Sequence, residues 1–160
     1  MVKLSKLKIK KEDYIFFSIV FAVIIIDQIT KFLIRNYFAV NQILFILDHM
    51  LYFTYLQNTG AGFGIFKNSI AVLIWISVIV IGVVLYFYDK IPKLASALIL
   101  GGTIGNLIDR IFLGYVVDFI DFRIWPAFNV ADSCLFIGVI LLAINFFIKK
   151  EEKYHKSSYK

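Results

Sequence analysis

The sequence predicts an all-α membrane protein with four transmembrane helices and a small external β-rich element between helices 1 and 2. Hydrophobic residues make up 61% of the chain and the mean hydropathy is +0.83, whereas about half of a soluble domain is apolar. The apolar residues gather in four long stretches, and a strand-like run separates the first two. A chain of 160 residues has no room for a soluble domain beside these stretches, so residues 1–160 are expected to form a single integral membrane domain.

Each apolar stretch is close to the roughly 20 residues that a helix needs to cross a hydrocarbon core about 30 Å thick. The first stretch continues past Asp27 and Lys31 instead of ending in a small-residue cleavage site, so we interpret it as a retained helix and not as a signal peptide. The second contains no charged residue, and the third ends in Asp109 and Arg110. The predicted spans cover residues 14–34, 70–87, 93–110 and 130–148.

Two connecting segments are expected to be extended. LYFTYLQ at 51–57 is rich in residues that favour strands, and NTGAGFG at 58–64 supplies glycines for turns. Between the third and fourth spans, GYVVDFIDFRIW at 114–125 alternates apolar and polar residues, and Trp125 suits the membrane interface. The sequence therefore predicts a small external sheet or hairpin that rests on the membrane.

The basic residues favour one orientation in the membrane. Of the 17 Lys and Arg residues, twelve lie in the two terminal tails and in the connection between the second and third spans. The other five are Lys31, Arg35, Lys67, Arg110 and Arg123. The positive-inside rule therefore places both termini in the cytoplasm. The net charge of +6 suits anionic membrane lipids, and no nucleic acid is expected as a partner.

Most of the acidic residues lie on the opposite, external side. Six of the 11 are aspartates that the predicted topology places there, namely Asp27, Asp48, Asp109, Asp118, Asp121 and Asp132. An ionised carboxylate inside a span costs about 2.5–3.5 kcal/mol even on insertion scales, so these residues need a structural or functional reason. Asp27 and Lys31 are four residues apart on one helix face. The preferred interpretation is an ion pair that stabilises the end of the span, and the alternative is contact with substrate or lipid headgroups.

The third span carries small and polar residues at helical spacing in GGTIGNLIDR at 101–110. One stripe holds Gly101, Gly105 and Asp109, and the adjoining stripe holds Gly102, Asn106 and Arg110. The glycines predict a close seam between helices. For Asn106 and Arg110, the pattern alone leaves structural and functional roles equally open.

Two aspartates, here called the aspartate pair, come from segments that both end at the external face: Asp118 of GYVVDF and Asp132 of FNVAD. Asn129 is expected to cap the helix that carries Asp132. Two close carboxylates share one proton, so that the ionised one can activate water while the protonated one polarises a peptide carbonyl. A single cysteine, Cys134, and two histidines outside the spans favour no metal site and no cofactor.

A small proton-coupled transporter is the alternative, because membrane carboxylates also serve as proton relays. It would use Asp27, Asp109 and Asp132. A relay requires acids at several depths, whereas these lie toward one face and the second span has none. A purely structural scaffold would leave the external aspartates unexplained.

Five ordered motifs resemble the lipoprotein signal peptidase family, the type II signal peptidases of bacteria. They are DQITK at 27–31, NTGAGFG at 58–64, GGTIGNLIDR at 101–110, GYVVDF at 114–119 and FNVAD at 128–132. The resemblance implies a four-helix aspartic endopeptidase of the bacterial plasma (inner) membrane, with its active site near the external face. The implied substrates are diacylglyceryl-modified prolipoproteins, cut on the N-terminal side of the lipidated cysteine.

The resemblance also implies roles for individual residues. The catalytic residues fall on Asp118 and Asp132. Positions that line the substrate groove fall on Asn58, Asn106, Arg110 and Asn129. Asp27, Lys31 and Asp109 match further polar positions with structural roles. We expect a monomer that contacts its prolipoprotein substrates and the membrane lipids.

The charge asymmetry predicts the orientation of the chain, which cysteine labelling can test. Cysteines placed at Ser157 and Ser69 in a Cys134→Ala background are expected to react with impermeant reagents from opposite sides of the membrane, the former only from the cytoplasm. Labelling at position 157 from outside intact cells would contradict the orientation.

Overall fold

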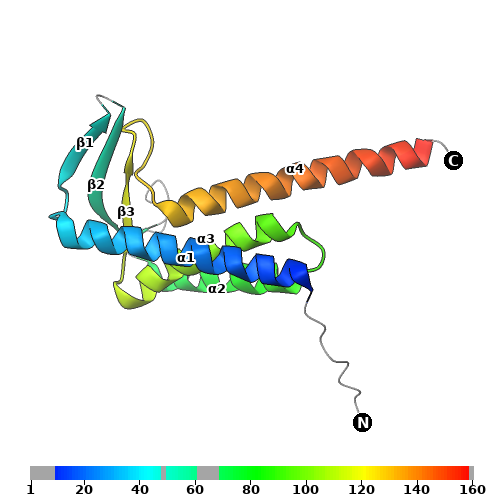
Figure 1. Cartoon of the computed structure of the whole chain (residues 1–160), viewed down its shortest axis with the longest axis horizontal. Helices are drawn as coiled ribbons and strands as arrows, with labels where there is room; N and C mark the ends of the chain where they lie inside the picture. Colours follow the sequence, from blue (N-terminus) through cyan, green and yellow to red (C-terminus); the bar gives the residue numbers. More distant parts are fainter. Residues whose placement is uncertain (1–9, 48–49, 61–68, 159–160) are drawn as a thin grey trace, which may run out of the picture.

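The computed structural model describes residues 10–47, 50–60 and 69–158. Within these ranges, four helices and a three-stranded sheet follow one another in the chain. They are α1 (Lys11–Tyr37), β1 (Ile43–Leu47), β2 (Leu51–Asn58), α2 (Ile70–Tyr86), α3 (Lys93–Phe112), β3 (Val116–Asp121) and α4 (Val130–Ser158). Figure 1 shows the sheet across one end of the helices, while α1 begins and α4 ends at the opposite end.

Within the described ranges, one helix lies at the position of each predicted span. By length and composition, three of those in the described ranges could cross a membrane: α1, α3 and residues 130–150 of α4. The fourth, α2, is apolar but only 17 residues long. Both α1 and α4 extend beyond the predicted spans, since Lys and Glu are good helix formers and continue the helix where the apolar stretch has ended.

The sheet is antiparallel in the order β1-β2-β3. The strand expected at 51–57 is β2, and the extended segment expected after the third span contains β3. The sequence predicted a β-rich element confined to the connection between helices 1 and 2. This is wrong, because β3 joins the sheet from the connection between α3 and α4. The strand β1 was not predicted, since a short apolar run such as ILFIL has no period that separates a strand from a helix.

The helix α3 lies at the centre and packs against the other three helices. The predicted close seam is present, but the two stripes of small residues face different helices, which the sequence did not predict. Gly101 meets Val23 of α1, and a Cβ atom there would lie 2.8 Å from the Val23 Cβ. At Gly102, a Cβ atom would clash with the backbone carbonyl oxygen of Ala131 in α4. Glycine is therefore required on α3 for α1 and α4 to approach it from two sides.

The sheet packs on the end of α1 through a cluster of apolar residues. Ile34 of α1 packs with Tyr55 of β2 and with Val117 and Phe119 of β3, all of which are buried. This contact fixes β3 beside the helix ends. The residue between Val117 and Phe119 is Asp118, so the cluster also fixes one member of the aspartate pair.

The seam can be tested with two alanine variants. Gly102→Ala places a methyl group against the α4 backbone and is expected to destabilise the protein by about 1–3 kcal/mol, as overpacking does. Gly82→Ala in α2 is the control, because no described atom lies within 4 Å of the added carbon; it is expected to be neutral or stabilising by up to ~1 kcal/mol. Thermal unfolding in detergent measures both, and equal unfolding temperatures would contradict a close seam.

Candidate active site

A cavity of about 580 Å³ lies between the sheet, the connection that follows β3, and the ends of α3 and α4. Both members of the aspartate pair line it, Asp118 from β3 and Asp132 from the first turn of α4. The other lining residues are Asn58, Gly60, Arg110, Val116, Trp125, Pro126, Ala127, Phe128, Ser133, Phe136 and Ile137. The pair thus faces a space with mostly apolar walls.

The start of α4 places Asp132 in the cavity wall. Asn129 caps the helix as predicted, because its Oδ1 accepts a hydrogen bond from the Asp132 backbone N (2.9 Å). The Asn129 backbone N donates in return to Asp132 Oδ2 (3.2 Å). The two reciprocal bonds hold the Asp132 carboxylate at the positive end of the helix, where a negative charge is favoured.

Three asparagine amides hold the two carboxylates. Asn58 Nδ2 donates to Asp118 Oδ2 (2.8 Å), and Asn129 Nδ2 donates to Asp118 Oδ1 (2.8 Å). Asn106 Nδ2 donates to Asp132 Oδ1 (2.8 Å), while its own Oδ1 accepts from Asn129 Nδ2 (3.2 Å). A continuous chain of amides therefore connects Asp118 to Asp132.

The environment of Asp118 favours its protonated form. The residue is 3% exposed, and burial, followed by the negative charge of Asp132, raises the pKa of Asp118 to about 7. The hydrogen bonds from Asn58 and Asn129 oppose this rise, because they favour the carboxylate. Asp118 is therefore able to hold a proton at neutral pH.

The structure divides the predicted groove residues into two sets. Asn58 and Arg110 line the cavity beside the aspartate pair. Asn106 and Asn129 do not belong to the lining; they are 3% and 0% exposed and lie behind the carboxylates that they contact. The Arg110 Nε is buried, and no described residue accepts a hydrogen bond from it.

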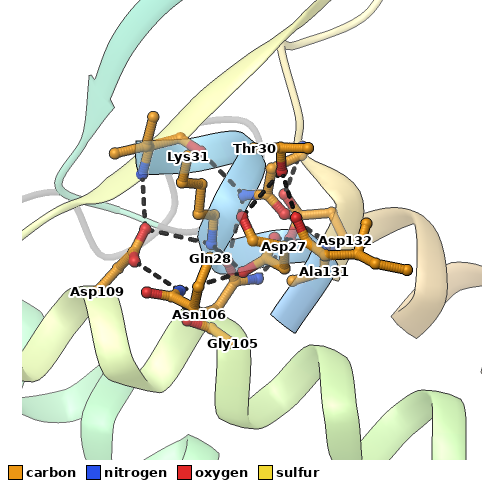
Figure 2. Close-up of polar contacts among 12 residues, drawn as sticks. Asp27, Gln28, Thr30, Lys31, Gly105, Asn106, Asp109, Ala131 and Asp132 are labelled. Atoms are coloured by element: carbon orange, nitrogen blue, oxygen red, sulfur yellow. Dashed lines mark hydrogen bonds and ion pairs between the residues drawn. The ribbon is translucent and has the colours of Figure 1, made fainter. Parts of the chain in front are cut away.

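A buried ion triad, formed by Asp27, Lys31 and Asp109, lies beside the amides. Lys31 Nζ is 2.8 Å from Asp27 Oδ2, which confirms the predicted pair, and 3.2 Å from Asp109 Oδ2. Lys31 Nζ also donates to Asn106 Oδ1 (2.9 Å). Figure 2 shows how these side chains from α1 and α3 converge near Asp132. The predicted structural residues and the aspartate pair are thus parts of one network.

Sequence reasoning missed Gln28 and the apolar wall of the cavity. Gln28 Nε2 donates to Asp109 Oδ1 (3.0 Å) and to the Gly105 carbonyl (3.1 Å). An amide inside an apolar span was the signal that could have identified it. The cavity wall carries no such signal, because Phe136 and Ile137 look like lipid-facing residues in the sequence.

The family model and the curated relatives that match this chain indicate one family. A family model described as "Signal peptidase (SPase) II" matches residues 19–148. The chain is similar to the lipoprotein signal peptidase of Moorella thermoacetica, with 42% identity over 79% of this chain and 89% of the relative. It is similar to that of Halothermothrix orenii, with 42% identity over 86% of this chain and 97% of the relative. A solved bacterial membrane enzyme with 34% identity superposes with a TM-score of 0.82 over 86% of this chain and 90% of the other.

The hydrogen bond from Asn58 to Asp118 allows a titration test. Asn58→Leu keeps a similar size and removes the donor, so the pKa of Asp118 is expected to rise above about 7. The measurement is the pH dependence of the infrared absorption of the protonated carboxyl, which Asp118→Asn identifies. Gln57→Met is the control, because Gln57 bonds the Tyr55 hydroxyl instead. A lower pKa in Asn58→Leu would contradict the assigned role.

Proposed function

The chain belongs to the signal peptidase II family, and we propose that it is an intramembrane aspartic endopeptidase that removes the signal peptide from diacylglyceryl-modified prolipoproteins. The proposed cut lies on the N-terminal side of the lipidated cysteine. One observation carries this proposal: Asp118 and Asp132 line the same cavity and are joined by hydrogen-bonded amides.

The two aspartates take different roles in the proposed reaction. Asp132, at the start of α4, is the ionised member and removes a proton from a water molecule. The water oxygen attacks the peptide carbonyl carbon, while Asp118 gives its proton to the carbonyl oxygen. The tetrahedral intermediate then collapses: one of its hydroxyl groups returns a proton to Asp118 as the carbonyl reforms, and the C–N bond breaks. The nitrogen leaves as an amine after receiving the proton that Asp132 took. The reaction consumes one water and forms no covalent enzyme intermediate.

The neighbouring polar residues divide into substrate contacts and supports. We assign Arg110 to the substrate backbone, because this residue lines the cavity and its Nε has no hydrogen-bond partner among the described residues. Asn58 lies where it can contact both the substrate and Asp118. Asn106 and Asn129 are supports that orient the carboxylates, since both are buried behind them.

The membrane defines how a lipidated substrate reaches this site. Its acyl chains can stay in the lipid if the scissile bond lies near the headgroup plane, so the substrate enters laterally. We propose that the sheet end of the molecule is external and both termini are cytoplasmic, because of the distribution of the basic residues. We also propose that α2 is the fourth span of one monomeric domain, because 17 residues lie at the lower limit of roughly 17–25 for a spanning helix.

The transporter alternative is not favoured by the contacts of its relay residues. Asp27 and Asp109 both pair with Lys31 in a buried site and also accept backbone N–H groups of Ala131 and Val117, so their contacts are those of structural residues. The matched family is also one of peptidases.

Asparagine variants of the aspartate pair test the mechanism. Asp118→Asn and Asp132→Asn are each expected to lower kcat by about 10²–10⁴-fold, because each removes a proton-transfer group. The double variant is expected to be little worse, as for residues that act as a unit. In the parent, kcat/KM is expected to fall as the pH rises through about 7, where Asp118 loses its proton.

The assay follows the shortening of a purified diacylglyceryl-modified prolipoprotein in detergent. Asp121→Asn is the matched control: Asp121 lies on β3 but outside the cavity lining, and it bonds Arg123, so its loss is expected to leave kcat near that of the parent. EDTA is expected to have no effect. Activity near the parental level in either single variant of the pair would disprove the proposed chemistry.

A further inference from the structure

The residue directly before each member of the aspartate pair is bonded to the ion triad. The Val117 backbone N donates to Asp109 Oδ2 (3.0 Å), and Val117 precedes Asp118. The Ala131 backbone N donates to Asp27 Oδ1 (2.9 Å), and Ala131 precedes Asp132. Both donors are fully buried, so water does not replace either bond and its loss would be costly.

Lys31 connects these two bonds through one ammonium group. It contacts the Asp27 carboxylate in its own helix and the Asp109 carboxylate in α3. The path from Asp118 to Asp132 therefore runs through the backbone of β3, the triad and the backbone of α4. None of the three triad residues lines the cavity, so any effect on the reaction is indirect.

The same ammonium fixes the direction of the Asn106 amide. Lys31 Nζ donates to Asn106 Oδ1 (2.9 Å), and an ammonium only donates, so the amide must turn its oxygen toward Lys31. Its Nδ2 then faces Asp132 Oδ1 (2.8 Å). Figure 2 shows Asn106 between the triad and Asp132. Lys31 is thus connected to Asp132 by two routes. One passes through Asp27 and the Ala131 backbone, and the other passes through the Asn106 amide.

Close packing and hydrogen bonds leave the three side chains of the triad little freedom to move. A Cβ at Gly105 would lie 2.6 Å from Asp27 Oδ2, so this carboxylate occupies the space that glycine leaves on α3. Gln28 Nε2 holds the other oxygen of Asp109 and the Gly105 carbonyl. Lys31 is 0% exposed, and a buried ion that loses its partner is strongly destabilising. The three residues therefore act as one rigid unit.

We propose that Asp27, Lys31 and Asp109 are positioning residues that set the separation and orientation of the Asp118 and Asp132 carboxylates for reaction. The inference rests on the proposed function, because it assigns the triad to the geometry of that aspartate pair. A displacement of about 1 Å at reacting groups costs on the order of 10²-fold in rate. Loss of the triad is thus expected to lower the rate of the chemical step, while the cavity that binds substrate stays intact.

The test is the double variant Lys31→Met/Asp109→Asn. It removes the ammonium and one of its two carboxylates together, while Asp27 keeps the Ala131 backbone N–H and the Gln28 amide as hydrogen-bond donors. In the cleavage assay, kcat is expected to fall by about 10²-fold with KM changed by less than about twofold. Thr103→Val is the control, because it removes another buried hydrogen bond of α3, to the Ile99 carbonyl (2.7 Å), and is expected to keep the parental kcat.

A folded double variant with parental kcat, or one in which only KM rises, would overturn the inference. If the double variant does not fold, Asp109→Glu replaces it, because it keeps the charge and moves the carboxylate by one methylene; parental kcat there would likewise overturn the inference. Asp118→Asn is assayed in parallel. Activity in Asp118→Asn would refute the proposed function, whereas an inactive Asp118→Asn beside a fully active triad variant would refute only the positioning role.

Discussion

A fully buried ammonium is the constraint on which the polar centre of this protein depends. Lys31 has no exposed surface, and a charge in such a place is tolerated only with partners within reach. Asp27 and Asp109 supply them, which requires α1 and α3 to lie close together at Gly105. The same two carboxylates accept backbone N–H groups from β3 and α4. One ion thereby fixes four elements of the fold relative to one another.

The apolar packing and the polar network support the same geometry. Glycines on α3 let α1 and α4 approach from two sides, and the apolar cluster around Val117 holds β3 against the end of α1. Asp118 and Asp132 belong to different elements, yet both line one cavity. Apolar packing and a hydrogen bond to the ion triad together hold β3 in place, and the same two kinds of contact hold α4. The proposed reaction needs this rigidity, since ångström-scale shifts in reacting groups are costly.

Local spacing explains what could be predicted from the sequence. The Asp27–Lys31 pair, the Asn129 cap and the two glycine stripes depend on helical periods of three or four residues, and the structure contains all of them. Non-local contacts could not be predicted from the sequence, because no periodicity relates the segments that they join. Examples are the bond from Val117 to Asp109, the bond from Gln28 to Asp109 and the pairing of β3 with β2. The apolar cavity wall was also missed, because lipid-facing and cavity-facing residues have the same composition.

The central claim is that the aspartate pair activates water directly and forms no covalent intermediate. A single turnover in water enriched in heavy oxygen, with enzyme in excess over a diacylglyceryl-modified prolipoprotein, tests it most directly. The account predicts one heavy oxygen atom in the new carboxyl group of every released signal peptide and none in the enzyme. Heavy oxygen in the side chain of Asp118 or Asp132, with ordinary oxygen in the first product, would show attack by an aspartate and contradict the account.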